Sequence, residues 1–156
     1  MKVLGVGPGT ATAGFAVLEI IDGVKKLLDC GVISTPSDHP MPERLEMIYK
    51  DLTEIVQQYK PDCIVIEQLF FGNNVTTAIS VGQARGVVML VGQQHKLGFA
   101  EYTPVQVKQS VTGYGQATKK QVQEMVKTIL GLKSVPRPDD AADAAAIAIC
   151  HSASCK

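Results

Sequence analysis

Two aspartates near the C-terminal end of the chain are spaced so that both carboxylates project from one side of a helix. Asp140 and Asp143 stand three residues apart in the stretch PRPDDAADAAAIAIC, within about one helical turn. The surrounding alanines indicate a closely packed helix, where carboxylates need a cation or hydrogen-bond donors nearby. Asp139 is also four residues from Asp143, but its position favours a first-turn role in which an acidic side chain meets the helix dipole.

A third carboxylate ends a run of apolar residues. Residues 63–66 are continuously apolar, which is typical of a strand covered on both faces, and Glu67 follows directly. In open α/β sheets, sites form outside the carboxyl ends of central strands. If Glu67 meets Asp140 and Asp143, the all-oxygen cluster suits Mg²⁺ or Mn²⁺ better than zinc. Such clusters serve phosphoryl transfer, where one metal ion activates water and another stabilises the leaving oxygen.

Basic residues gather in one part of a chain whose formal net charge is zero. Between residues 108 and 137 there are six basic side chains and one acidic side chain: Lys108, Lys119, Lys120, Lys127, Lys133, Arg137 and Glu124. A local excess of this kind can attract a polyanion even when the whole chain is neutral. A solvated helix face would give the same pattern, so the charge alone leaves both interpretations open.

The glycine-rich stretch GVGPGTATAG, residues 5–14, could be a phosphate-binding loop, a turn or part of a catalytic segment. It matches neither the G-x-G-x-x-G fingerprint nor the Walker A pattern. The residues that follow it indicate a strand, not the helix whose N-terminus would face a phosphate. We therefore interpret the stretch as a first strand and its turn.

The cysteines indicate neither a disulfide framework nor a zinc site. The sequence has no C-x-x-C pair, and Cys30 and Cys63 lie in apolar runs where a thiol acts as a small core residue. Cys150, His151 and Cys155 lack a fourth ligand. There is also no leader pattern and no apolar run of about eighteen residues, so we expect a cytoplasmic protein without a membrane span.

The elements that would position these side chains follow a mixed α/β order. Three strands joined by tight turns come first, followed by a helix, a strand, a helix, a strand and terminal helices. We expect strands over residues 2–6, 14–20, 26–34, 63–66 and 99–102, and helices over residues 40–59, 74–94, 139–151 and, on both sides of a loop at 113–115, from residue 104. This order predicts one domain over residues 1–156, with a five-stranded mixed sheet flanked by helices and a frayed tail at residues 152–156.

Four motifs make the chain similar to a known family: IEQLFF, VGQARGVVML, YTPVQVKQSVTGYGQATKKQVQEMV and PDDAADAAAIAICH. In this order and over nearly its whole length, the chain resembles the RuvC family of Holliday junction resolvases. The resemblance implies an RNase H-like fold and a homodimer with the helix over residues 74–94 at its interface. It implies a Mg²⁺-dependent endonuclease of DNA recombination and repair that nicks two opposed strands of a four-way junction symmetrically, with two metal ions per site and Mn²⁺ as a substitute. It also implies partnership with the RuvA and RuvB branch-migration proteins.

The resemblance assigns the family's metal-binding carboxylates to Glu67, Asp140 and Asp143, the three residues of the cluster argued above. A fourth carboxylate belongs on the first strand, in a Gly-Ile-Asp-Pro-Gly motif. Residues 5–9 here are Gly-Val-Gly-Pro-Gly, so Gly7 occupies the Asp position. Because glycine has no side-chain oxygen, two expectations follow: a nuclease that cleaves slowly, or a junction-binding dimer with impaired or absent cleavage.

Further family roles concern DNA contact. Lys108 and Lys119 match basic positions that contact the scissile region or its phosphates, and Lys120 adds a charge beside them. Phe70 resembles the aromatic that family members insert near the junction crossover. Phe71 could share that role or belong to the core, because two adjacent strand-end rings cannot both face inward.

Overall fold

The computed structural model describes residues 1–7, 11–68 and 75–154. Its strands are β1 (Lys2–Gly7), β2 (Thr12–Ile21), β3 (Val24–Ser34), β4 (Cys63–Glu67) and β5 (Gly98–Tyr102). Its helices are α1 (Met41–Tyr59), α2 (Val75–Gln94), α3 (Pro104–Thr112), α4 (Lys119–Ile129) and α5 (Asp139–Ser154).

The strands form one mixed sheet with the order β3-β2-β1-β4-β5. β1, β2 and β3 pair antiparallel, whereas β4 runs parallel to both β1 and β5. The turn between β2 and β3 has positive φ at Asp22 and Gly23, 52° and 79°, as a two-residue hairpin requires. β1 and β4 are therefore central neighbours whose C-terminal ends meet at one edge of the sheet, and the expected five-stranded mixed α/β architecture is confirmed.

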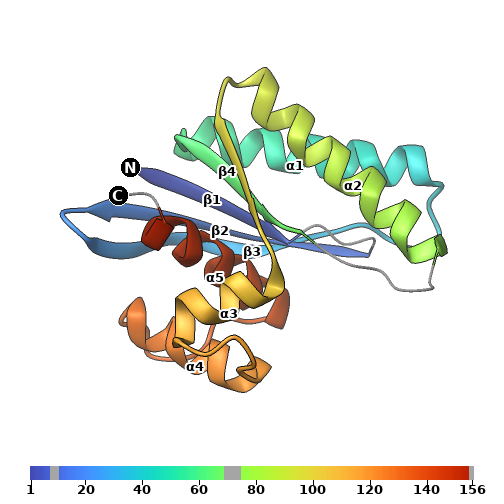
Figure 1. The fold of residues 1–156 in the computed structure, drawn as a ribbon. Helices are drawn as coiled ribbons and strands as arrows, with labels where there is room; N and C mark the ends of the chain where they lie inside the picture. Colours follow the sequence, from blue (N-terminus) through green and yellow to red (C-terminus); the bar gives the residue numbers. More distant parts are fainter. Residues whose placement is uncertain (8–10, 69–74, 155–156) are drawn as a thin grey trace.

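Helices cover both faces of this sheet (Figure 1). On one face, α1 and α2 pack on alternate residues of the central strands, Leu4, Val6, Ile64 and Ile66. The opposite face carries Val3 and Val65 and is covered by α5, with α3 and α4 packed against that helix. Because both faces are covered, β1 and β4 are apolar at nearly every position.

Helix α5 lies unusually close to the sheet because two strand glycines leave room for its backbone. A Cβ at Gly5 would collide with the carbonyl oxygen of Ala144, and a Cβ at Gly14 would collide with that of Asp140. The alanines of α5 complete this close contact, since all those from Ala141 to Ala148 are buried. The first two turns of α5, which bear Asp140 and Asp143, are thus held directly over β1 and β2.

The structure differs from the sequence expectation by two residues or more at the ends of three elements. β2 and β3 each begin two residues earlier than expected, because their pairing continues to both ends of the hairpin. The expected frayed tail at residues 152–156 is wrong for residues 152–154, because α5 continues to Ser154. The side-chain hydroxyls of Ser152 and Ser154 bond back to the carbonyls of Ile149 and Cys150 in this last turn.

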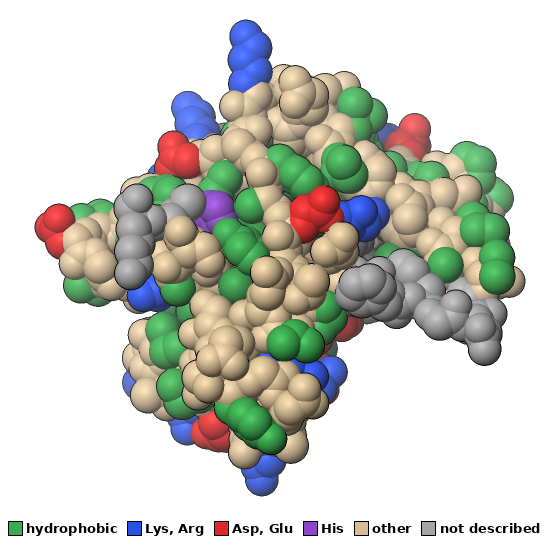
Figure 2. Space-filling view, viewed as in Figure 1, with side chains coloured by type: hydrophobic (Ala, Val, Ile, Leu, Met, Phe, Trp, Pro, Cys, Tyr) green, Lys and Arg blue, Asp and Glu red, His purple; other side chains and the backbone are tan. Residues whose placement is uncertain are grey.

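Helix α2 departs from the expectation that no segment is apolar enough to span a membrane. By length and composition alone it could cross a membrane, with a mean hydropathy of 1.3 over eighteen residues. One side packs against α1 and the sheet through Ala84, Val88 and Val91. The other side leaves Met89 and Leu90 exposed, and Figure 2 shows apolar side chains gathered along this helix. Its hydropathy therefore combines a core face with an exposed apolar face.

Candidate active site

Glu67 is the last residue of β4, at the edge of the sheet where the central strands end. Its backbone is aligned with Tyr102 of β5, and β1 runs along the other side of the strand. Partial burial raises the pKa of the Glu67 carboxyl above its ordinary value. The charge of Asp143 raises this pKa further, and Lys108 opposes the shift. A carboxylate in this setting favours a cation beside it.

Asp143 faces the same space from the second turn of α5. Burial is the first cause of its raised pKa, Lys119 lowers that pKa, and Asp140 and Asp139 raise it. The Nζ atom of Lys119 lies 3.8 Å from Oδ2 of Asp143. Two half-buried carboxylates, from β4 and α5, are thus close enough for the charge of Asp143 to raise the pKa of Glu67.

A pocket of about 310 Å³ joins these groups. Its polar lining consists of Glu67, Asp143, Lys108 and Lys119, and its walls are apolar side chains of α3, α4 and α5. Ammonium groups contact phosphate oxygens, and carboxylates hold hard divalent cations. The pocket therefore has the groups needed to bind a phosphodiester and a metal ion together, which matches four of the residues singled out in the sequence.

Asp140 lies apart from this pocket lining. The hydroxyl of Thr12, at the start of β2, donates a 2.6 Å hydrogen bond to Oδ2 of Asp140. Within residues 1–7, 11–68 and 75–154, no group of three or more histidine, cysteine or acidic side chains lies close enough to hold a metal ion. The structure thus brings Glu67 and Asp143 together and leaves Asp140 bonded to the neighbouring strand.

Asp139 occupies the first turn of α5, the position for which a favourable interaction with the helix dipole is expected. Its carboxylate pairs with Arg137, at 3.3 Å, and with Lys119, at 3.6 Å. Lys119 therefore stands between the carboxylates of Asp139 and Asp143. These partners account for Asp139 without a metal ion.

Gly7 ends β1 beside the strand that bears Glu67. It is paired with Gly14 of β2, and the preceding residue, Val6, is aligned with Ile66 of β4. No described atom lies within 4 Å of the place where a Cβ would be, and the residue has no positive φ that would require glycine. Neither steric space nor backbone conformation therefore demands a glycine at this position.

Lys120, one of the predicted DNA contacts, does not line the pocket. Lys120 lines a neighbouring groove instead, together with Tyr114 and Met125. Phe70 and Phe71 lie outside the described residues, so their assignments stay predictions.

Thr12 is the site-adjacent residue that the sequence did not single out. The Thr12–Asp140 bond joins residues 128 positions apart, and threonine is an ordinary residue in a strand. The only available signal was its place five residues after Gly7, at the start of the next predicted strand.

Comparison with known proteins gives one consistent result. The family of crossover junction endodeoxyribonucleases RuvC matches residues 3–151. A protein of Chloroflexus aggregans with the name crossover junction endodeoxyribonuclease RuvC is 54% identical over 152 residues, covering 97% of this chain and 93% of that protein. The structure of Thermus thermophilus RuvC has a TM-score of 0.92 at 35% identity, covering 98% of this chain and 94% of that one.

A second solved structure contains DNA. T. thermophilus RuvC in complex with a Holliday junction substrate has a TM-score of 0.93 at 35% identity, covering 97% of this chain and 93% of that one. The RNase H-like fold is also found in the yeast mitochondrial Holliday junction resolvase Ydc2, which has a TM-score of 0.70 at 13% identity.

Proposed function

We propose that this chain, which belongs to the RuvC family of crossover junction endodeoxyribonucleases, hydrolyses phosphodiester bonds at four-way DNA junctions in recombination and repair. The observation that carries the proposal is the pocket at the end of β4, where Glu67 and Asp143 face Lys108 and Lys119. A symmetric pair of nicks, one from each copy of a homodimer, is the reaction that we expect.

The chemistry of the pocket suits a hard divalent cation. Its ligand atoms are carboxylate oxygens. The raised pKa values of Glu67 and Asp143 reflect burial and repulsion from neighbouring carboxylates, and the charge of a bound cation offsets both effects. Glu67 and Asp143 would hold Mg²⁺ or Mn²⁺, and Asp140 would join them through a rearranged side chain. Bound metal supplies activation of water and stabilisation of the leaving oxygen.

The remaining groups of the pocket act on the DNA. Lys108, half-buried beside Glu67, and Lys119, beside Asp143, would bind the non-bridging oxygens of the scissile phosphate. Their positive charge offsets the negative charge that accumulates on those oxygens in the transition state. The apolar walls of the pocket would face a bound phosphate and reduce its contact with water.

A second candidate function is supported by Gly7. The position lies at the end of β1 next to Glu67, yet it contributes no oxygen. The chain would then be a junction-binding dimer with impaired or absent cleavage, because the loss of one preorganised charge in such a site costs on the order of a few kcal/mol of transition-state stabilisation.

One experiment separates the two candidates. Cleavage of a synthetic four-way junction is measured in Mg²⁺ and in Mn²⁺ for the native protein and for Gly7→Asp, with a linear duplex as the control substrate. A native protein that cuts the junction as fast as Gly7→Asp establishes the nuclease and removes the second candidate. Junction binding with cleavage only in Gly7→Asp establishes the binding dimer. Failure of both proteins to bind the junction would contradict both functions.

The exposed face of α2 is the surface that we propose for the homodimer. Met89 and Leu90 are 42% and 50% exposed, and Phe99 of β5 continues the apolar surface beside them. Burial of such a surface between two copies removes apolar area from water. The resemblance further supports a cytoplasmic location for this protein and a partnership with RuvA and RuvB. A pull-down with purified RuvA and RuvB on junction DNA tests that partnership.

A further inference from the structure

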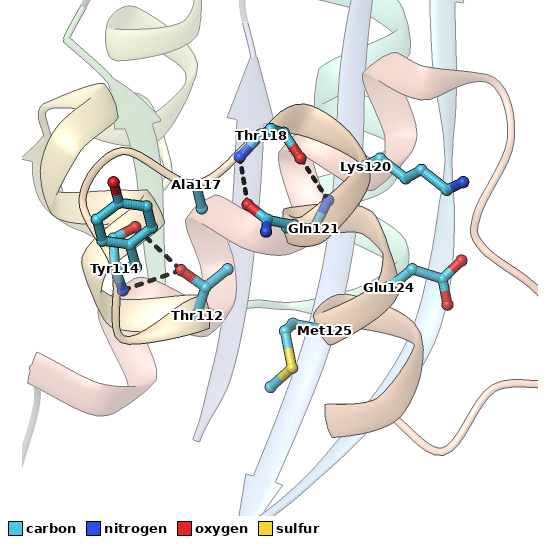
Figure 3. A pocket seen from close by; sticks show the side chains of 8 residues that line it. All are labelled: Thr112, Tyr114, Ala117, Thr118, Lys120, Gln121, Glu124 and Met125. Atoms are coloured by element: carbon cyan, nitrogen blue, oxygen red, sulfur yellow. Dashed lines mark hydrogen bonds between the residues drawn. The ribbon is translucent and has the colours of Figure 1, made fainter.

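An apolar groove lies beside the proposed active site, between the α3–α4 loop and helix α4. It has a volume of about 460 Å³, and its lining includes Thr112, Tyr114, Ala117, Lys120, Gln121 and Met125, which we call the Tyr114 groove. In Figure 3, Tyr114 stands at one side of the groove, with Met125 and Ala117 between it and the outer side of α4. Nothing in the proposed chemistry uses this groove.

Tyr114 presents an exposed ring from a fixed backbone. The residue is 59% exposed. The Tyr114 backbone N–H donates to Oγ1 of Thr112, and its carbonyl accepts from the same hydroxyl, each at 3.0 Å. The carbonyl also accepts from the N–H of Ala117 at 3.1 Å. A fixed ring of this kind can be contacted without loss of backbone entropy, which favours binding over an ordinary role in the core.

Lys120 gives the groove a cation for a phosphate at the start of α4, and Glu124 is the one acidic side chain among the described lining residues. Helix α4 begins with Lys119 and Lys120, and its first turn contains no acidic residue. Among the described residues, no carboxylate forms an ion pair with Lys120, although Glu124 lies one turn further along the same helix (Figure 3). Lys119 has the carboxylates of Asp139 and Asp143 beside it. Lys120 is a cation at the positive end of the helix dipole, and a nearby phosphate relieves the repulsion between the two.

The groove and the proposed catalytic pocket lie on opposite sides of the first turns of α4. Lys119 and Val122 line the pocket, whereas Gln121 and Met125 line the groove. A helix with its side chains is about 10–12 Å across, and successive nucleotides of a strand rise about 3.4 Å along the duplex axis. A strand held in the pocket therefore reaches the groove about three nucleotides from the phosphate that is cut.

We propose that the Tyr114 groove binds one unstacked nucleobase of the junction, about three nucleotides from the scissile phosphate. The base stacks on the ring of Tyr114 over the apolar floor formed by Met125 and Ala117, and Lys120 contacts the adjoining phosphate. This inference rests on the proposed function, because it assigns a second contact for the same DNA.

The test is an abasic scan of the junction. Synthetic four-way junctions carry one abasic site at each of the five positions on either side of the cut, which is mapped with Gly7→Asp. Binding is measured by gel retardation in Ca²⁺ for the native protein, Tyr114→Leu and Tyr114→Phe. Val24→Ala is the control, because Val24 is 69% exposed at the distant β2–β3 turn.

We expect Tyr114→Leu to bind the intact junction about 5- to 10-fold more weakly, with Tyr114→Phe and Val24→Ala unchanged. An abasic site at one position should weaken junction binding by the native protein by a similar factor. The same abasic site should leave junction binding by Tyr114→Leu unchanged. Equal effects of every abasic site on both proteins would overturn the stacking assignment. Native binding with no loss in Tyr114→Leu would also overturn it, while leaving the proposed function intact. No binding of any junction by the native protein would instead contradict the proposed function.

Discussion

Gly7 and Gly14 are paired residues on neighbouring strands, yet their surroundings differ completely. A Cβ at Gly14 would collide with the backbone of Asp140, whereas no described atom lies near a Cβ at Gly7. Packing therefore explains the glycine at position 14 and does not explain the one at position 7. A side chain at position 7 would be added to the edge of the site at little steric cost.

Gly7→Asp should create a stronger binding site for divalent cations. The added carboxylate lies beside Glu67 at the ends of two parallel strands, and hard cations bind more tightly as anionic oxygens are added. Isothermal titration calorimetry with Mn²⁺ should show an affinity increase of at least about tenfold. Gly7→Asn is the control of equal shape, and an equal increase in that variant would contradict the role of charge.

Thr12→Val should destabilise the protein, because it leaves the half-buried carboxylate of Asp140 without its 2.6 Å donor. Hydrogen bonds to charged groups contribute about 1.5–3 kcal/mol. Urea denaturation should therefore give a lower free energy of unfolding by about this amount. Thr12→Ser keeps the hydroxyl and should retain most of the stability; equal losses in the two variants would assign the effect to packing.

At the scale of elements, the central question is how α5 is positioned over the sheet. Asp140 and Asp143 belong to this helix, and their distance from Glu67 depends on the close backbone contacts at Gly5 and Gly14. The buried alanines permit the same approach from the helix side. The two aspartates therefore move together whenever the position of α5 on the sheet changes.

Gly14→Ala should displace α5, because its methyl group would meet the carbonyl of Asp140. Overpacking of this kind destabilises by about 1–3 kcal/mol. Thermal and urea unfolding should show the loss, and Mn²⁺ affinity in the Gly7→Asp background should fall with it. Gly7→Ala is the matched control and should change stability by less than about 0.5 kcal/mol.

The sequence was sufficient for the parts of the site that depend on local periodicity. The apolar run before Glu67 and the three-residue spacing of Asp140 and Asp143 predicted a strand end and one side of a helix, and the structure has both elements. The separation of Asp140 from Glu67 and Asp143 was not predictable in this way. It depends on Thr12, which becomes a neighbour of Asp140 only through the packing of α5 on β2.

At the scale of the whole molecule, two surfaces are unusual: the basic surface formed by Lys108 of α3 and by Lys119 and Lys120 of α4, and the apolar face of α2 (Figure 2). They come from different layers, since α2 covers one face of the sheet and α3 and α4 lie beyond the other. A dimer formed through α2 would leave the basic surface of each copy free to contact DNA.

Leu90→Glu should convert the proposed dimer into a monomer, because dimerisation would then bury a charged side chain in an apolar interface. Sedimentation velocity over a range of protein concentrations measures the change. Ile21→Glu is the control, since Ile21 is 57% exposed at the end of β2, away from α2. A native protein that sediments as a monomer throughout would contradict the dimer.

The stability of the whole protein should depend on His151. This side chain is buried in α5, its Nδ1 is hydrogen-bonded to the Tyr102 hydroxyl at 2.8 Å, and burial lowers its pKa. The unfolded chain therefore binds a proton more readily than the folded protein. The stabilisation is complete above the ordinary histidine pKa of about 6.5 and is lost as the pH falls toward the lower folded value.

Unfolding free energies measured in urea between pH 8 and pH 5 test this dependence. The native protein should lose stability below about pH 6.5 more steeply than His151→Gln. The raised pKa values of Glu67 and Asp143 act in the opposite direction at lower pH, and both proteins share them. Parallel curves for the two proteins would exclude His151 as the cause.

The ion pair between Arg85 and Glu101 joins α2 to β5, the strand that runs beside Glu67. In a dimer built on α2, this pair would connect the subunit contact to β5 and, through its pairing with β4, to the strand that bears Glu67. The separation between the two proposed catalytic centres of the dimer would then be constant. That separation would determine which two phosphates of a junction can be cut together, independently of the base sequence around them.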